Sequence, residues 1–233
     1  MKRIAILTGA GMSAESGIST FRDSGGLWEK YPVMQVASHT GWEKDPVLVN
    51  NFYNQRRKEL LATQPCRAHK LLAQLQSQYH IDIRTQNVDN LHERAGSDNV
   101  LHLHGELMKV CSSRDVENPK YWKILNADNY EVKPGEKAGD GSLLRPYIVF
   151  FEEAVPMIEP AAQQVAQADI FVIIGSSLNV YPAAGLISYT RPDIPIFVID
   201  PNDVKIRHNY NVTHIKQSAT PGVEQLIQQL QTL

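Results

Sequence analysis

Residues 4–14 read IAILTGAGMSA, a short apolar run that leads directly into a glycine-rich turn. The run Ile4–Thr8 has the length and composition of a strand that is buried on both faces. The G-x-G-x-x-A turn of residues 9–14 precedes a helix start, and its glycines let backbone N–H groups approach a pyrophosphate. The pattern favours a dinucleotide-binding α/β fold, although a tight strand-to-helix turn without a ligand has a similar sequence.

The region after this turn argues against the common redox dinucleotide fold. That fold places an acidic residue at the end of a second strand about 20 residues further on. Here residues 26–35 read GLWEKYPVMQ, which contains a proline and has no strand pattern. The dehydrogenase interpretation is therefore disfavoured.

Further apolar runs of strand length alternate with helix-like stretches along the rest of the chain. We expect strands at residues 81–85, 100–103, 147–151, 170–174 and 194–199. We expect helices at residues 68–79, 160–168 and 183–189, and from residue 222 onward. This alternation predicts an α/β fold, with a Rossmann-like parallel sheet and helices on both of its faces.

Two stretches interrupt the alternation and predict a smaller inserted lobe. Residues 28–66 carry aromatic and charged residues in helical spacing, and residues 112–145 are polar and punctuated by Pro and Gly. We expect one domain, residues 1–233, with a Rossmann-like core of about residues 1–27, 67–110 and 146–233. The small lobe then comprises about residues 28–66 and 111–145.

The composition disfavours several classes of protein. Lys and Arg number 23 against 25 Asp and Glu, whereas nucleic acids and anionic lipids bind proteins with a basic excess. No apolar run reaches the roughly 18 residues of a membrane span, and the opening MKRIAILTGAG runs into glycines without a signal-peptide cleavage pattern. We expect a cytoplasmic protein that binds neither nucleic acid nor membrane, and we expect it to be a monomer.

Five segments occur in order over nearly the whole chain: GAGMSAESGISTFRD (9–23), TQNVDNLHERAG (85–96), LHLHGEL (101–107), RPYIVFFEE (145–153) and GSSLNVYPAAG (175–185). Together they resemble the sirtuins, which are NAD-dependent protein lysine deacylases. The resemblance implies NAD as the cofactor and acyl-lysine proteins or peptides as the partners. It predicts removal of acetyl groups, and of succinyl or malonyl groups, with nicotinamide and O-acyl-ADP-ribose as products.

The resemblance also implies which residues bind NAD. The pyrophosphate end and the nicotinamide ribose would contact Gly9, Ala10, Gly11, Glu15, Ser16, Phe21 and Arg22. The nicotinamide pocket would be lined by Gln86, Asn87 and Asp89, of which Asn87 and Asp89 would also be catalytic. The other phosphates and ribose would contact Gly175, Ser176 and Ser177, and the adenine would lie beside Asp200, Pro201, Asn202, Asp203 and Ala219. By themselves, Asn87 and Asp89 also fit a strand end followed by a helix N-cap.

His104 matches the catalytic base of the sirtuins. In their reaction the acyl-lysine oxygen attacks the ribose C1′ as nicotinamide leaves, and a base then helps a ribose hydroxyl attack the acyl carbon. Histidine, with an ordinary pKa of about 6.5, accepts such a proton near neutral pH. His102 faces the same side of a strand, so periodicity does not distinguish the two. The Gly105-Glu106 pair that follows favours His104.

Tyr53 and Arg56 lie on one helical face because they are three residues apart. For a random pair of this kind, a packed aromatic ring and a solvated arginine is the ordinary interpretation. Within a sirtuin, the pair resembles the subgroup that removes succinyl and malonyl groups, since a guanidinium binds a carboxylate through two parallel hydrogen bonds. The resemblance also implies that the peptide substrate pairs with a strand containing Val149, Phe150 and Phe151.

Two departures from the sirtuin pattern concern a metal site and the peptide-binding strand, and there are milder ones at Ser176, where threonine is usual, and at Asp200, where asparagine is common. Most sirtuins hold a structural zinc with four cysteines, but this chain has only Cys66 and Cys111, so we expect no zinc. Glu152 occupies a position where the family usually has glycine, and we expect its side chain to alter how a substrate backbone pairs with residues 149–151.

Two alternative functions use the same NAD pocket. The first is ADP-ribosyl transfer or NAD hydrolysis, which is disfavoured because pure transfer does not need the ribose hydroxyl that His104 would activate. The second is a non-catalytic NAD-sensing module, which is disfavoured because Asn87, Asp89 and His104 are all present.

Overall fold

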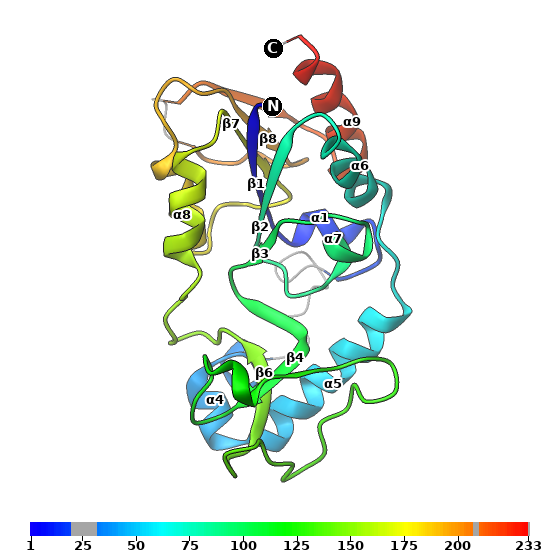
Figure 1. The fold of residues 1–233 in the computed structure, drawn as a ribbon, viewed down its shortest axis with the longest axis vertical. Helices are drawn as coiled ribbons and strands as arrows, with labels where there is room; N and C mark the ends of the chain where they lie inside the picture. Colours follow the sequence, from blue (N-terminus) through cyan, green and yellow to red (C-terminus); the bar gives the residue numbers. More distant parts are fainter. Residues whose placement is uncertain (20–31, 207–209, 233) are drawn as a thin grey trace.

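The computed structural model of the chain describes residues 1–19, 32–206 and 210–232 (Figure 1). Phe21 and Arg22, which we expect beside the nicotinamide ribose, lie outside the described residues. Within the described part, no helix is long and apolar enough to cross a membrane. A six-stranded sheet occupies the upper part of Figure 1, and a three-stranded sheet lies below it.

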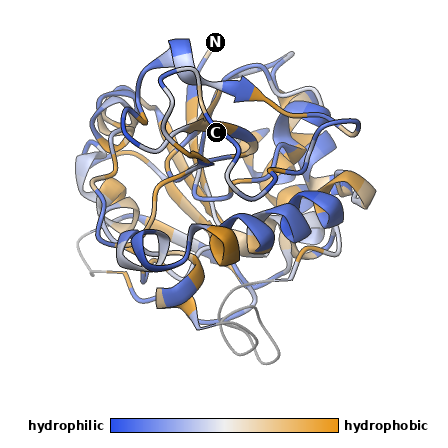
Figure 2. Cartoon of the chain, turned by 90° about the horizontal axis from the view of Figure 1, so that it is seen from below, coloured by the Kyte–Doolittle hydropathy of each residue, from blue (hydrophilic) through white to orange (hydrophobic). Residues whose placement is uncertain are grey.

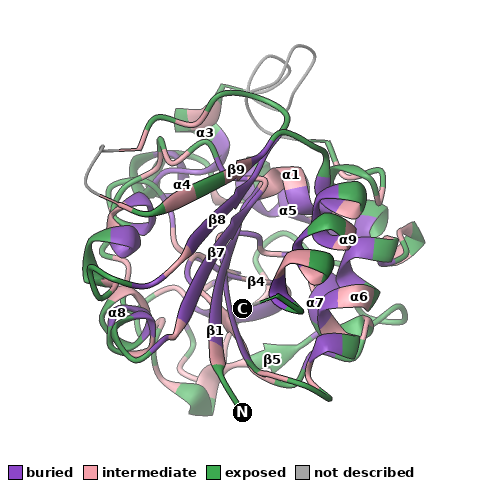
Figure 3. Ribbon diagram, turned by 90° about the horizontal axis from the view of Figure 1, so that it is seen from above, coloured by how far each residue is buried: buried purple, intermediate pink, exposed green. Residues whose placement is uncertain are grey.

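The most apolar runs of the sequence form the large sheet. In spatial order its strands are β3 (Val100–His102), β2 (His80–Thr85), β1 (Arg3–Thr8), β7 (Ile170–Ile174), β8 (Ile196–Ile199) and β9 (Val212–Ile215). All neighbouring strands pair in parallel. Every residue of β7 and β8 is buried, and Figure 3 shows these strands at the centre of the molecule. The prediction of an α/β fold with a Rossmann-like parallel sheet is confirmed.

Helices cover both faces of this sheet. Alternate side chains of β1 point to opposite faces, and because they are apolar on both, each face is buried under helices. The covering elements are α6 (Arg67–Leu75), α9 (Ala219–Leu230), α8 (Ile158–Ala166) and the 3₁₀-helix η2 (Ala183–Tyr189). Ile4 and Ile6 belong to a buried cluster with residues of α6 and α9, whereas Ala5 and Leu7 belong to a second cluster with residues of α8 and η2. Figure 2 shows the hydrophobic strands inside and many hydrophilic residues on the surrounding segments.

The small sheet is antiparallel and packs against a group of helices. Its strands, in spatial order, are β5 (Lys123–Ile124), β4 (Gly105–Ser112) and β6 (Leu144–Ile148). The helices are α3 (Val33–Val36), α4 (His39–Lys44) and α5 (Pro46–Ala62), and a 3₁₀-helix η1 (Pro119–Tyr121) precedes β5. Trp42, Phe52, Leu107 and Phe150 form part of the buried cluster that joins these helices to the sheet.

The strand that we expect at residues 147–151 is wrong in its bounds and its partners. The observed strand β6 ends at Ile148 and pairs antiparallel with β4, outside the large sheet. It ends there because the next backbone groups bond elsewhere, such as the Phe150 N–H, which donates to the Glu153 carboxylate (2.8 Å). Because β4 and β6 cross the boundaries at residues 110 and 146, the proposed division into core and small lobe stays a prediction.

Candidate active site

Two glycine-containing turns meet at the carboxyl edge of the large sheet. Gly9 follows β1 and Gly175 follows β7, and the Gly11 N–H donates to the Gly175 carbonyl (3.0 Å). A Cβ atom on Gly9 would lie 2.6 Å from the Gly175 carbonyl oxygen, so this packing requires glycine. The strand order reverses between β1 and β7, and open α/β sheets bind their ligands at such a point.

Three buried side chains beside these turns form what we call the Ser13 cluster: Ser13, Asn87 and Asp89. Ser13 lies in α1 (Ala10–Ala14), and its hydroxyl donates to the Asp89 carboxylate (2.9 Å). The Asn87 amide donates to Ser13 Oγ and to the Gly9 carbonyl (both 3.0 Å). The cluster therefore joins the end of β2 to the first glycine turn.

The Asp89 carboxylate accepts hydrogen bonds from two different elements. Its second carboxylate oxygen accepts from the Leu91 N–H (3.1 Å), at the start of α7 (Leu91–Arg94). Burial raises the pKa of Asp89, although the hydrogen bonds from Leu91 and Ser13 act in the opposite direction. Asp89, which precedes the N-cap residue Asn90, thus binds the first backbone N–H of α7 while its other oxygen stays in the Ser13 cluster.

His104 presents one ring nitrogen as a proton acceptor. Its Nδ1 lies 3.1 Å from the Gln86 carbonyl oxygen, and a carbonyl only accepts, so Nδ1 carries the ring proton. Nε2 then has a free lone pair, and it has no hydrogen-bond partner among the described residues. Burial lowers the pKa of His104, despite the opposing effect of the Gln86 carbonyl, so the ring is neutral at pH 7. Such a ring can act as a general base.

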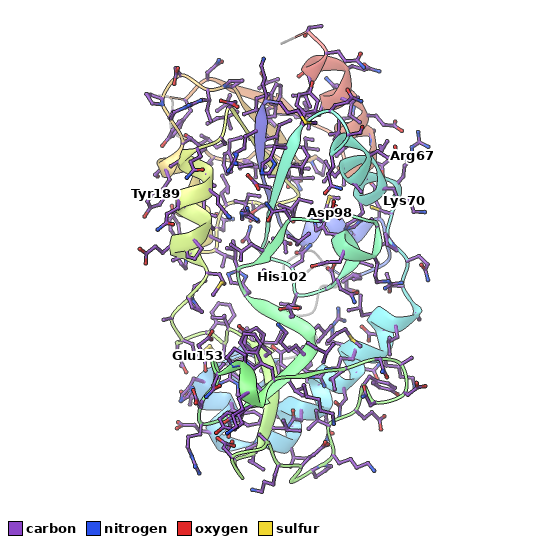
Figure 4. All side chains as sticks on the ribbon, in the orientation of Figure 1. Arg67, Lys70, Asp98, His102, Glu153 and Tyr189 are labelled. Atoms are coloured by element: carbon purple, nitrogen blue, oxygen red, sulfur yellow. The ribbon has the colours of Figure 1, made fainter. Side chains whose placement is uncertain are left out.

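His102 has the opposite electrostatic character, although it lies only two residues away. Its Nδ1 is 2.9 Å from the Asn87 carbonyl and its Nε2 is 2.7 Å from the Glu93 carboxylate, so both nitrogens face acceptors. Burial acts to lower the pKa of His102, but the hydrogen bond and charge of Glu93 outweigh it and the pKa is raised. Figure 4 labels His102 at the level where the two sheets meet. The two histidines therefore contact the backbone carbonyl oxygens of two consecutive residues, Asn87 and Gln86. Of the two rings, only that of His104 keeps a nitrogen lone pair without a hydrogen-bond partner among the described residues.

The remaining predicted NAD residues lie along the same edge. The Gln86 amide donates to the Ser176 hydroxyl (2.8 Å), while Ser177, Pro201, Asn202 and Asp203 are exposed. Asp200 follows β8, and Ala219 is buried at the start of α9. Glu15 and Ser16 already bond within the chain: Glu15 accepts from the Thr220 N–H and Ser16 from the Cys66 N–H (both 2.9 Å). Glycine backbone, amides and hydroxyls at one sheet edge fit a dinucleotide.

Tyr53 and Arg56 lie on α5, as expected, but each already has partners. The Tyr53 ring is buried against Phe150, with 6.0 Å between ring centroids, and burial raises its pKa. The Arg56 side chain is 14% exposed and forms an ion pair with Glu59. The positive charges of Arg145, Arg57 and, less strongly, Arg56 oppose this rise in the pKa of Tyr53.

The comparisons with known proteins agree with this geometry. The sequence model of the Sir2 family, which comprises the sirtuins, matches residues 9–182. The chain belongs to the Sir2 family. A protein of Bacteroides thetaiotaomicron named NAD-dependent protein deacylase is 59% identical over 230 residues, covering 99% of this chain and 98% of that protein. The family resemblance predicted from the sequence is confirmed.

Solved structures of Sir2 homologues have the same fold. One homologue, a mutant in complex with ADP-ribose, has a TM-score of 0.89 at 33% identity and covers 99% of this chain and 92% of that chain. Another, in complex with NAD, has a TM-score of 0.86 at 33% identity and covers 99% and 90%. The Sir2 fold therefore extends over nearly all of the chain.

The segment that we expect to pair with a Sir2 peptide substrate, residues 149–151, has most of its backbone groups occupied. The Val149 N–H donates to the His104 carbonyl (3.0 Å), and the Phe151 N–H donates to Ala37 (2.9 Å). Phe150 bonds through both of its backbone groups to Glu153. Pairing along residues 149–151 is therefore limited to the Val149 carbonyl, as far as the described residues show.

The described part of this Sir2 chain contains no group of three or more His, Cys, Asp or Glu residues placed to hold a metal ion. Cys111 is buried in β4, where burial raises the pKa of its thiol to about 12, and Cys66 lies before α6. Both cysteines fall within the predicted small lobe, Cys66 at the end of its first segment and Cys111 at the start of its second. The absence of zinc stays a prediction.

Sequence reasoning did not identify several residues that hold the site together. Ser13 lies within the first quoted segment, but a serine inside a G-x-G-x-x-A turn is not distinctive. Arg145 and Glu153 form a partly buried two-point ion pair, with distances of 2.7 and 3.0 Å. Both lie in the segment RPYIVFFEE, and their opposite charges at its two ends are the signal that could have indicated them.

Proposed function

We propose that this chain removes acyl groups from protein lysines in an NAD-dependent reaction that yields nicotinamide and O-acyl-ADP-ribose. The observation that carries the proposal is the free acceptor nitrogen of neutral His104, beside the Ser13 cluster at the sheet edge. The relative named NAD-dependent protein deacylase, at 59% identity over nearly the full chain, supports the same activity.

NAD would bind along the glycine turns and the ends of β1, β2, β7 and β8. The residues proposed to hold it are Gly9, Ala10, Gly11, Gln86, Asn87, Asp89, Gly175, Ser176, Ser177, Asp200, Pro201, Asn202 and Ala219, with Glu15, Ser16, Phe21 and Arg22 completing the set. NAD supplies an electrophilic ribose carbon and the ribose that finally carries the acyl group. The chain supplies positioning and a proton acceptor.

His104 Nε2 would accept the proton of a ribose hydroxyl. The Gln86 carbonyl fixes the ring tautomer through Nδ1, so the lone pair of Nε2 is available without rearrangement. Asn87 and Asp89 would shape the nicotinamide pocket, since their side chains are held from two directions by Ser13 and by the backbone. A preorganised pocket of this kind costs little reorganisation during the reaction.

The acyl-lysine would reach His104 between the two lobes. A cavity of about 440 Å³ is bordered by residues of both sheets, including His102 and Gly105, and by Val149, although His104 is not one of its lining residues. Figure 4 shows Glu153, which also borders it, below the level of His102. This route would bring the lysine past residues 149–153.

We also propose a preference for succinyl or malonyl groups, supported by Tyr53 and Arg56 on α5. The substrate carboxylate would replace Glu59 as the partner of Arg56, gaining charge-assisted hydrogen bonds of about 1.5–3 kcal/mol each. Arg56→Met should therefore lower kcat/KM for a succinyl peptide about ten- to a hundredfold more than for an acetyl peptide. Lys58→Met, an exposed residue of the same helix, serves as the control. An unchanged ratio would mean that Arg56 does not contact the acyl group.

One experiment tests the main proposal. The protein is incubated with NAD and a panel of acyl-lysine peptides, and all products are identified by mass spectrometry. Deacylated peptide, nicotinamide and O-acyl-ADP-ribose in equal amounts are the expected result. ADP-ribosylated peptide or free ADP-ribose without deacylation would favour transfer or hydrolysis. Binding of NAD without any product would favour a sensing role.

We further propose that the protein acts in the cytoplasm as a monomer and binds no nucleic acid. The net charge of −2 and the two unpaired cysteines support these expectations. Light scattering across a range of protein concentrations tests the monomer, and a gel-shift assay with DNA and RNA tests the absence of nucleic-acid binding.

A further inference from the structure

Glu152 has a backbone conformation that suits glycine. Its φ angle is 78°, and Leu178 is the other non-glycine residue with a positive φ in the described part of the chain. Side chains rarely adopt this left-handed region, because Cβ approaches the backbone carbonyl. Some interaction must therefore hold Glu152 in place.

Thr40, in the first turn of α4, supplies that interaction. One oxygen of the Glu152 carboxylate accepts from the Thr40 N–H (2.9 Å) and from the Thr40 hydroxyl (2.8 Å). These bonds, the backbone one first, lower the pKa of Glu152, so the carboxylate stays charged at neutral pH. The side chain is thus turned onto α4.

The neighbouring backbone is anchored to the same helix and to the candidate base. The Phe151 carbonyl accepts from the His39 N–H (3.1 Å), and the Val149 N–H donates to the His104 carbonyl (3.0 Å). The segment 149–152 therefore connects His104 to α4. In the described part of the chain, the backbone N–H and C=O of Glu152 have no hydrogen-bond partner, unlike those of Phe150 and Phe151.

We propose that Glu152 is a positioning residue for the acyl-lysine substrate. By bonding to Thr40, its carboxylate holds a non-glycine residue in the left-handed conformation, and this conformation presents segment 149–152 to the substrate backbone. An extended peptide pairs with the backbone groups that an edge leaves free. The inference rests on the proposed deacylase function. It adds to it the hydrogen bonds to Thr40, which let Glu152 adopt the conformation that glycine usually adopts at this position.

The proposal predicts a particular order among substitutions of Glu152. Glu152→Ala loses the bonds and keeps the unfavourable conformation, so KM for an acyl peptide should rise about five- to tenfold. Glu152→Gln keeps an acceptor oxygen for Thr40, and Glu152→Gly adopts the conformation without help. Both should stay within about threefold of the wild-type KM.

Thr40 supplies a second, independent test. Thr40→Val loses the hydroxyl and keeps the N–H, so KM should rise about two- to threefold. If Thr40 and Glu152 act as a pair, adding Thr40→Val to Glu152→Ala should cause no further rise. Glu43→Ala, which removes an exposed carboxylate of the same helix, is the matched control and should leave KM unchanged.

The measurements separate positioning from mere folding. KM for the peptide, KM for NAD and kcat are determined for each variant; partial unfolding would lower the apparent kcat and leave both KM values alone. A Glu152→Ala variant with the wild-type peptide KM would overturn the proposal, as would a Glu152→Gly variant as poor as Glu152→Ala. If the wild-type protein shows no deacylation, the proposed function fails, and the same order is then tested by the affinity for a fluorescent acetyl-lysine peptide.

Discussion

Two clusters of hydrogen-bonded side chains lie in different parts of this chain and have similar composition. The Ser13 cluster joins an aspartate to a serine at the carboxyl edge of the large sheet. Beside the small sheet, Ser112 and Ser142 each donate a hydroxyl to Asp140 (both 2.7 Å), and we call these three residues the Ser112 cluster. The chemical groups are alike, but their surroundings differ.

The difference appears in the charge of the two aspartates. Burial raises the pKa of Asp89, whereas the hydrogen bonds from Ser112 and Ser142 lower the pKa of Asp140 to about 2. A carboxylate kept in a position that disfavours its charge is typical of functional sites. We therefore expect the Ser13 cluster to serve both folding and chemistry, and the Ser112 cluster to serve folding alone.

The largest expected effect lies at the edge of the Ser13 cluster, at His104. His104→Ala removes the general base, so turnover of acyl-lysine peptides should fall about a hundred- to ten-thousandfold. The rate is measured by following deacylated peptide. His80→Ala, at the opposite end of β2, is the control and should retain activity. Full turnover by His104→Ala would mean that catalysis does not take place beside the Ser13 cluster, and the two clusters would then not differ in function.

The pH dependence of activity sharpens the same assignment. Because burial lowers the pKa of His104, the ring should remain a base below the ordinary histidine pKa of about 6.5. The acid limb of kcat/KM should therefore lie below pH 6.5, with activity falling as protons block Nε2. A limb above that value would point to His102, whose pKa is raised by Glu93, as the titrating group. A steady-state pH profile with a stable acyl peptide distinguishes them.

Paired serine substitutions test the comparison directly. Ser13→Ala removes a donor to buried Asp89 and an acceptor for Asn87, and should lower the free energy of unfolding by about 1–3 kcal/mol. Activity should fall as well. Ser142→Ala, in the Ser112 cluster, should lower stability without changing kcat/KM. Denaturant unfolding measures the free energy of unfolding, and steady-state kinetics measure kcat/KM. Equal losses of kcat/KM in the two variants would contradict the proposed difference between the clusters.

The large sheet could be predicted from the sequence because its central strands are almost continuous apolar runs. IFVII at 170–174 is buried on both faces, and local sequence is then enough. The strand β4, with the sequence GELMKVCS, was not expected, because Lys109 interrupts its pattern. Lys109 is nevertheless 9% exposed, since its ammonium lies over the rings of Trp122 and Tyr147. These rings come from distant segments, which local patterns do not reveal.

The candidate site was predictable in its members and less so in its contacts. His102 and His104 share one face by periodicity, and the contact of His102 with the Glu93 carboxylate, which makes the two histidines electrostatically different, is not visible in the sequence. The positive φ of Glu152 was not predictable either, because it depends on Thr40, more than 100 residues away in sequence. Long-range hydrogen bonds therefore account for what sequence patterns miss.

The smallest expected effect is that of a zinc chelator on the small lobe. A structural zinc closes with four N or S ligands, and Cys66 and Cys111 are the two cysteines of the chain. In the small sheet, the Lys109 ammonium instead lies over the rings of Trp122 and Tyr147, at 4.5 and 4.7 Å from the ring centroids. EDTA should leave the melting temperature unchanged, and elemental analysis should find no stoichiometric zinc. Lys109→Met, which removes a desolvated cation–π contact of about 2 kcal/mol, should lower the melting temperature in the same assay. A chelator effect larger than that of Lys109→Met would show that a metal, and not these side chains, holds the small lobe.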